Sequence, residues 1–267
     1  MSRTDDTRRS WDACAERYDR WYGTFEGAVE HQVDWTLLRA HLPESRSARI
    51  LDAAGGTGRA AVPLARMGYP VTLADISPGM LEVARRKLVE EDLADRVEIV
   101  ECDIAELGFA DESFDLVICW DGMSEHAARE LVRVAKRGGR LSLYLTNRIG
   151  VAIERFAERP EEALALLRSP WSETCFDVDG FAHRPLAMSV EEAKFFFERQ
   201  GVTVSVIHAV CGLLRLLSIP DEIRKSREWD AELFRRTGEM LVCLSDEPSA
   251  KGFSRHLVVC GERSAKP

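Results

Sequence analysis

The sequence has few of the features that mark membrane, secreted, metal-dependent or repetitive proteins. It contains no Pro/Gly/Ser-rich run, no low-complexity tract and no internal repeat, so no linker divides it into separate domains. The longest apolar stretch, Ala209 to Ile219, is interrupted by Arg215 and is far too short to span a bilayer. The seven cysteines form no CxxC pair, and no set of His, Cys and acidic residues has metal-site spacing. We therefore expect no membrane segment, no disulfide framework and no bound metal.

Positive charge is scarce relative to negative charge. The chain has 36 Lys and Arg against 45 Asp and Glu, a formal net charge of −9. An acidic surface repels phosphate backbones, so nucleic acid is not an expected partner. The first residues, MSRTDDTRRS, are polar and unlike a signal peptide, and with the scattered cysteines they predict a cytoplasmic protein. The oligomeric state stays open between monomer and homodimer.

Strands and helices are predicted to alternate through the first half of the chain. The expected strands are almost wholly apolar, which is typical of a parallel sheet covered on both faces. They span Ala48–Asp52, Val71–Asp75, Val97–Cys102, Phe114–Trp120 and Arg140–Thr146, with helices over Gly56–Gly68, Pro78–Glu90 and Glu125–Lys136. Two later strands, Val202–Ala209 and His256–Glu262, do not continue this alternation. The predicted fold is α/β, with a doubly wound, mostly parallel sheet of seven strands whose ligands bind beyond the carboxyl ends.

The chain is interpreted as one domain, 1–267, with four parts. Residues 1–47 are predicted to be an N-terminal helical lid; its helical part is expected because apolar and aromatic residues recur at helical spacing from Ser10 to Leu42. Residues 48–147 form the cofactor-binding core and 149–188 a cap insertion over the substrate. Residues 189–267 complete the sheet and contain a helix that opens with the capping box Ser189–Glu192.

The segment ILDAAGGTGRAA, Ile50 to Ala61, carries the sharpest chemical signal. A strand ends at Asp52 and a glycine-rich turn leads into a helix, so the backbone can bend tightly and approach a ligand closely. Gly56 to Ala61 satisfies the G-x-G-x-x-A form of the dinucleotide fingerprint. Arg59, in the first helical turn, is either a carboxylate contact or a surface charge.

Three acids stand at the ends of three successive strands. Asp75 can accept hydrogen bonds from both hydroxyls of a ribose, and Asp103 can accept from an adenine amino group. Asp52 precedes the glycine turn, where it would repel a pyrophosphate and attract an ammonium group. The three positions together fit adenosine joined to a zwitterion better than a dinucleotide.

These motifs resemble those of the class I S-adenosylmethionine (SAM)-dependent methyltransferases of the Rossmann-like, small-molecule type. In order they are LDAAGGTG, VTLADISPGML, ECDIAEL, ESFDLVICW and ELVRVAKRGGRLSLYLTN, and they cover Ala48 to Asn147. The resemblance implies SAM as cofactor and S-adenosylhomocysteine as product. One departure is that Ala54 stands where the family has its first glycine.

The resemblance also implies a role for each position. The backbone near Ala54, with Gly56 and Gly58, would hold the methionine part of SAM, and Asp52 would support its ammonium group. Asp75 would hold the ribose, with Ile76 and Met80 flanking the adenine. Asp103 and Ile104 would read the adenine edge, and Trp120 would lie near the reactive methyl group.

The acceptor side is less defined. Tyr18 and Tyr22, in WDACAERYDRWY, resemble the tyrosines with which many small-molecule members close the site, and Tyr18 is the stronger candidate; the alternative is an aromatic stripe that packs on the sheet. His126 is either a general base or a helix-start residue. Further acceptor contacts are predicted at the end of the fifth strand and in the cap, at Asn147, Trp171, Phe181 and His183.

The acceptor is expected to be a metabolite or natural product methylated on O, N or C. The fourth strand ends in CWDGM, which matches neither the motif used for nucleobase amines nor the loop of arginine methyltransferases. Two other functions remain open: a nicotinamide-dependent oxidoreductase, and a SAM-binding partner subunit without activity.

Overall fold

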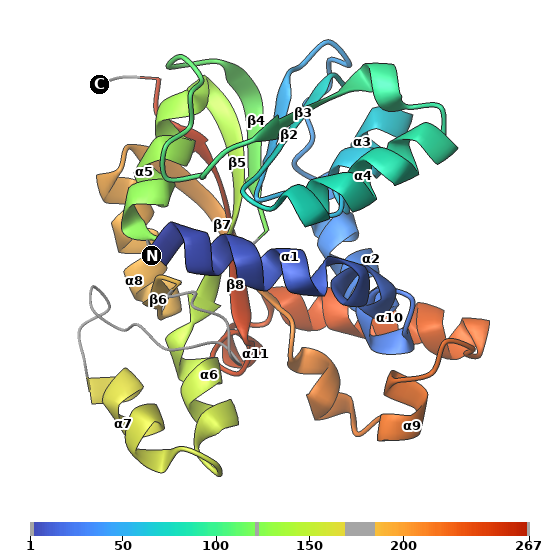
Figure 1. Cartoon of the computed structure of the whole chain (residues 1–267). Helices are drawn as coiled ribbons and strands as arrows, with labels where there is room; N and C mark the ends of the chain where they lie inside the picture. The colour runs from blue at the N-terminus through green and yellow to red at the C-terminus, as the bar shows by residue number, and fades with distance from the viewer. Residues whose placement is uncertain (1–2, 121–122, 169–184, 266–267) are drawn as a thin grey trace.

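One twisted sheet runs through the middle of the computed structural model, which describes residues 3–120, 123–168 and 185–265 (Figure 1). Its strands are β1 Ile50–Ala53, β2 Val71–Asp75, β3 Val97–Glu101, β4 Phe114–Cys119, β5 Ala135–Asn147, β6 Ala187–Met188, β7 Val202–Val210 and β8 His256–Arg263. The spatial order is β3-β2-β1-β4-β5-β8-β7, and β6 pairs with β5. β1 to β5 run parallel, whereas β8 is antiparallel to both β5 and β7.

The predicted doubly wound, mostly parallel sheet is confirmed, and its strand count was one too low. The additional strand is β6, which has two residues and is too short to produce a readable alternation. The order reverses between β1 and β4, because β2 and β3 extend the sheet to one side and β4 and β5 to the other. In such sheets the crevice at the reversal point receives the ligand.

Helices cover both faces of the sheet. They are α1 Arg3–Trp21, α2 Phe25–Arg39, α3 Ala61–Arg66, α4 Pro78–Glu90, α5 Glu125–Val134, α6 Arg148–Arg155, α7 Pro160–Arg168, α8 Val190–Arg199, α9 Asp221–Arg224, α10 Ala231–Asp246 and α11 Pro248–Lys251, with 3-10 turns η1 Ala94–Arg96 and η3 Leu213–Leu217. Side chains of α2, α3, α4 and α10 join one buried apolar cluster, and those of α5 and α8 join another. β1 contributes side chains to both clusters, because Ile50 packs in the first cluster and Leu51 in the second.

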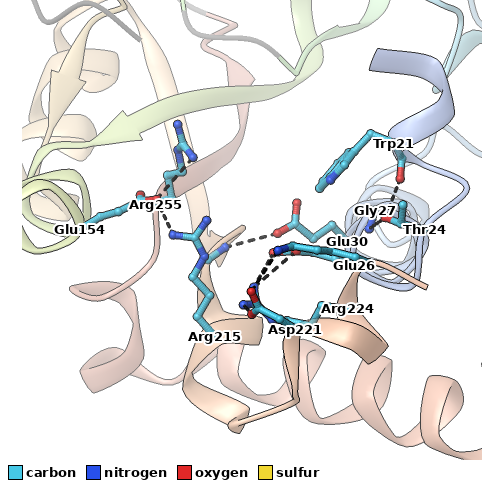
Figure 2. Close-up of polar contacts among 12 residues, drawn as sticks. Trp21, Thr24, Glu26, Gly27, Glu30, Glu154, Arg215, Asp221, Arg224 and Arg255 are labelled. Atoms are coloured by element: carbon cyan, nitrogen blue, oxygen red, sulfur yellow. Dashed lines mark hydrogen bonds and ion pairs between the residues drawn. The ribbon is translucent and has the colours of Figure 1, made fainter. Parts of the chain in front are cut away.

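The single helical segment expected from Ser10 to Leu42 is two helices. Thr24 ends the first and caps the second: its hydroxyl donates to the Trp21 carbonyl at 2.7 Å and accepts from the Gly27 amide at 3.2 Å (Figure 2). A Cβ on Gly27 would lie 2.4 Å from the Trp21 carbonyl oxygen, so only glycine permits this close turn.

The segment predicted as a cap, 149–188, contains α7, β6 and most of α6, whereas its residues 169–184 lie outside the described chain. Within the described residues, no helix combines the length and the apolarity that a bilayer crossing needs.

Candidate functional site

A cavity of about 240 Å³ opens where the sheet order reverses. The three acids predicted from the strand ends, Asp52, Asp75 and Asp103, all line it. Of the other predicted cofactor contacts, those that also line it are Ala54, Gly56, Ile76, Met80, Ile104 and Trp120. Gly58 is not among the lining residues. Its backbone has φ +79°, and a Cβ on it would contact the Ala84, Val62 and Leu73 side chains.

The glycine-rich turn leaves room for a ligand. A Cβ on Gly56 would meet nothing nearer than the Met80 sulfur at 3.9 Å and the Asp75 carboxylate at 4.0 Å, so it would project into the cavity. A Cβ on Gly55 would lie 2.8 Å from the Asp52 carboxylate. Ala54, which replaces the family's glycine, has φ +52°, a left-handed conformation that costs an alanine roughly 1–2 kcal/mol.

Backbone amides hold each of the three carboxylates in place, and Asp103 accepts from the Ala105 amide at 2.9 Å. Asp52 accepts from the Ala61 amide at 2.9 Å and so anchors the start of α3. Asp75 accepts from the amides of Gly56 at 2.9 Å and Ser77 at 2.8 Å. Burial raises the pKa of Asp52 to about 7, partly offset by that Ala61 amide. A cationic group bound beside Asp52 would lower this pKa again.

α1 contributes Thr7, Trp11 and Tyr18 to the lining of the cavity. Figure 1 shows this helix crossing in front of the sheet. Asp12 joins α1 to the start of α4: one of its carboxylate oxygens accepts from the Ser77 hydroxyl at 2.6 Å and the Gly79 amide at 2.9 Å. Sequence reasoning missed Asp12, although it lies in the same WDACAERYDRWY segment as the tyrosines.

Arg59 is a largely buried cation of the site, with 13% of its side chain exposed, and not a surface charge. Its guanidinium donates to the Tyr22 hydroxyl at 2.6 Å and pairs with Asp34 of α2 at 3.4 Å. The guanidinium carbon lies 4.4 Å from the ring centroid of Tyr22 and 5.3 Å from that of Trp120. Tyr22 does not line the cavity, but its hydroxyl donates to that of Tyr18, which does. Burial raises the pKa of Asp34 to about 6, opposed by Arg59.

The charge of Arg59 acts on two histidines, His31 and His256. Burial and the positive charge of Arg59 lower the pKa of His31 to about 4. Burial and the positive charges of Arg255 and Arg59 lower the pKa of His256 to about 3. The Nδ1 atom of each is buried and makes no hydrogen bond within the described chain. His256 had been interpreted only as the start of the last strand.

A row of carboxylates continues along one face of α2, away from the cavity. Asp34, Glu30 and Glu26 follow one another at intervals of four residues. Figure 2 shows Arg224 reaching Glu26, with 3.4 Å between nitrogen and oxygen. Burial and the two neighbouring acids raise the pKa of Glu30 to about 7. A space of about 10 Å³, the size of one water molecule, lies between Glu30 and Asp34.

The structure does not bring every predicted acceptor residue to the cavity. His126 is exposed on α5, whereas its neighbours Ser124 and Ala127 line the cavity. Trp171, Phe181 and His183 lie outside the described residues.

Asn147 is fully buried and holds other parts of the chain. Its amide group donates to the carbonyls of Lys251 and Ser254 at 2.8 Å each, and its oxygen accepts from the Ile149 amide at 3.2 Å. Both amide hydrogens of Asn147 are therefore used within the chain, which leaves none for the predicted contact with the acceptor. Asn147 instead holds the turn before β8.

Comparison with known proteins agrees with this geometry. Residues 50–139 match the model of a methyltransferase domain. The chain is 32% identical over 185 residues to the ubiquinone/menaquinone biosynthesis C-methyltransferase UbiE of Pseudomonas putida, covering 66% of this chain and 70% of that protein.

Solved structures show the same fold. One is a SAM-dependent methyltransferase of Thermotoga maritima, described as a possible histamine N-methyltransferase, with a TM-score of 0.58, 19% identity and coverage of 97% of this chain and 100% of that one. Another is geranyl diphosphate C-methyltransferase of Streptomyces coelicolor with S-adenosylhomocysteine bound, with a TM-score of 0.56, 15% identity and coverage of 85% and 77%. The chain belongs to the class I SAM-dependent methyltransferases.

Proposed function

We propose that this methyltransferase alkylates a small molecule that carries an acidic hydroxyl group, and that the methyl group goes to a carbon activated by that hydroxyl. The observation that carries the proposal is Arg59, a buried cation that lines the cofactor cavity beside Trp120. The name of the UbiE relative, a C-methyltransferase of quinone biosynthesis, supports carbon as the acceptor atom.

The assignment of SAM to individual residues is part of this proposal. Asp75 would accept from the ribose hydroxyls, Asp103 from the adenine amino group, and Asp52 would face the ammonium group. Two features favour this placement: the unfilled space over Gly56, and the concentration of three carboxylates in one cavity. A pyrophosphate would be repelled by the same carboxylates, which disfavours a nicotinamide cofactor.

SAM supplies a methyl group on a sulfonium ion, so the donor is already activated and the protein has mainly to orient the acceptor and exclude water. Trp11 and Tyr18 of α1 cover the cavity and would exclude water. An acceptor oxygen near Arg59 would be stabilised as an oxyanion, which makes the adjacent carbon electron-rich. The Tyr18 hydroxyl, held through Tyr22, would orient that oxygen.

O-methylation of the same hydroxyl is the second candidate, because Arg59 would favour the ionised oxygen in either reaction. Incubation with SAM labelled with ¹³C in its methyl group separates them, since aryl-methyl and methoxy carbons have distinct NMR shifts. The panel contains phenols and hydroxylated naphthalenes, with aliphatic and aromatic amines as comparison.

We expect carbon-methylated product from the hydroxylated rings only. We also expect loss of turnover in Arg59→Lys, whose point charge replaces the planar guanidinium. The exposed Arg85→Lys on α4 is the matched control and should turn over normally. Turnover of amines alone would refute the acceptor class, and methoxy product alone would refute carbon as the acceptor atom.

A further inference from the structure

Away from the cofactor cavity, three side chains of metal-binding type meet at one point. They are His41, just after α2, His208 of β7 and Cys260 of β8, and their ligand atoms all lie within 4.8 Å of one another. His208 pairs with Val258 in the antiparallel ladder, and Cys260 lies two residues further along β8. His208 and Cys260 therefore point to the same face of the sheet, the face that the end of α2 approaches.

One ring nitrogen of His208 makes no hydrogen bond with the described residues. The His208 side chain is only 7% exposed, and its Nδ1 atom lies 2.6 Å from Asp246 Oδ1. Its Nε2 atom is buried and makes no hydrogen bond within the described chain. A buried ring nitrogen without a partner is costly, and a ligand would remove that cost.

The surroundings match those of metal-binding histidines. A ligating imidazole usually gives its other N–H to a carboxylate, which fixes the ring orientation, and Asp246 occupies that position on His208. Ser142 lies opposite Cys260 in the β5–β8 ladder, so both side chains are on the same face of the sheet. The Ser142 hydroxyl accepts from the Trp120 indole at 3.3 Å, so its one hydrogen is free to point at the sulfur.

We propose that His41, His208 and Cys260 bind one Zn²⁺ ion, with Asp246 and Ser142 orienting the ligands. Two imidazoles and a thiolate form a donor set that suits Zn²⁺, with water as the fourth ligand of the tetrahedron. Binding forms a zinc–sulfur bond as the Cys260 thiol releases its proton to solvent.

The geometry needs only a small adjustment. Bond lengths to tetrahedral zinc place two imidazole nitrogens and a thiolate sulfur about 3.3–3.6 Å apart, so the widest separation must close by up to about 1.5 Å. His41 can supply this movement because it follows the end of α2 and is partly exposed. His208 and Cys260 are fixed by the β7–β8 ladder. The ion would thus tie the end of α2 to the antiparallel edge of the sheet.

Cobalt(II) is the probe, because a thiolate ligand gives it a charge-transfer absorption and tetrahedral coordination gives intense visible bands. The full chain is reduced, treated with a chelator, passed into metal-free buffer and titrated with Co²⁺, then with Zn²⁺. We expect one equivalent of cobalt per chain, a thiolate charge-transfer band, and displacement by zinc.

The variants separate binding from folding. Cys260→Ala should remove the charge-transfer band, whereas Cys243→Ala, at an exposed cysteine of α10, should keep it. His41→Asn changes a partly exposed side chain and should weaken binding at least about tenfold; Asp246→Asn should weaken it on the order of 10–100-fold. Each variant's metal-free melting temperature and SAM affinity are measured to establish that it is folded.

The proposal is overturned if the wild-type chain shows no charge-transfer band with one equivalent of cobalt. It is equally overturned if the band persists in Cys260→Ala or if folded His41→Asn binds cobalt as tightly as the wild type.

Discussion

Replacement of Arg59 by methionine tests the buried ion pair of the site. The side chains of Arg59 and Asp34 are 13% and 1% exposed, and their charged atoms are 3.4 Å apart. Removing one partner of a buried pair costs about 3–5 kcal/mol, because the other charge is left without compensation. Since Arg59 retains some exposure to the cavity, we expect the free energy of unfolding to fall by about 3 kcal/mol.

A double variant isolates the cause of that loss. Asp34→Asn in the Arg59→Met background removes the uncompensated charge, so we expect about 2 kcal/mol of the loss to return. Urea denaturation followed by tryptophan fluorescence and circular dichroism measures both variants against the wild type.

The loss should also depend on pH. Burial raises the pKa of Asp34 to about 6, so the stability that this carboxyl contributes is present below its unfolded pKa of about 4 and is lost as the pH rises through about 6. Without Arg59 the pKa of Asp34 rises further, because in the wild type the positive charge of Arg59 lowers it. The loss in free energy of unfolding caused by Arg59→Met should therefore become smaller as the pH falls from about 8 to about 5. A loss below about 1 kcal/mol at pH 8, with no recovery in the double variant, would show that the pair is not desolvated.

Four further predictions concern the cavity itself. Asp75→Ala should weaken SAM binding by about 1–3 kcal/mol in a folded protein, because hydrogen bonds to a charged group are lost, and calorimetric titration measures this; unchanged affinity would remove the ribose assignment. The pKa of Asp52 is raised to about 7, and a bound ammonium group favours the ionised carboxylate, so SAM affinity should increase as the pH rises from about 6 to about 8. Binding should release a proton, which calorimetric titration in buffers of different ionisation heat detects. The absence of proton release would contradict the pairing of Asp52 with the ammonium group. Gly55→Ala should destabilise the chain by about 1–3 kcal/mol in urea, since its Cβ would lie 2.8 Å from the Asp52 carboxylate, and a neutral effect would mean that the turn can relax. Tyr18→Phe should lower turnover whereas His126→Ala should not, because only Tyr18 lines the cavity; a turnover defect confined to His126→Ala would reverse this ranking.

The cofactor core could be predicted from sequence because its signals are local. Asp52 and Asp75 lie at the carboxyl ends of the apolar strands β1 and β2, and Asp103 comes just after β3; parallel strands end at the same edge, so their order along the chain already implies that they meet. The bounds of β2 and α4 also agree with prediction, since a proline at the first helical position marks the start of α4. The break between α1 and α2 was not foreseen, because apolar spacing continues across it and only Thr24 and Gly27 reveal the turn.

The acceptor side was decided by tertiary structure. Arg59 looks the same in sequence as a surface arginine, and its role depends on Asp34 and Tyr22, which α1 and α2 bring from a distant part of the chain. Asn147 looks like a strand-end ligand contact, yet residues near Ser254 take up its amide group.

What the sequence alone indicated is the sheet, its ligand edge and the three acids that line one cavity, because each strand, glycine turn and strand-end acid is marked by a local pattern. What only the tertiary structure decided is which polar side chains share a buried environment. His41, His208 and Cys260 illustrate the difference: they lie far apart in the sequence without metal-site spacing, and the β7–β8 ladder with the end of α2 places them within 4.8 Å of one another. Charges and ligands act over ångströms in space, and spacing along the chain does not encode those distances once the contacts are long-range.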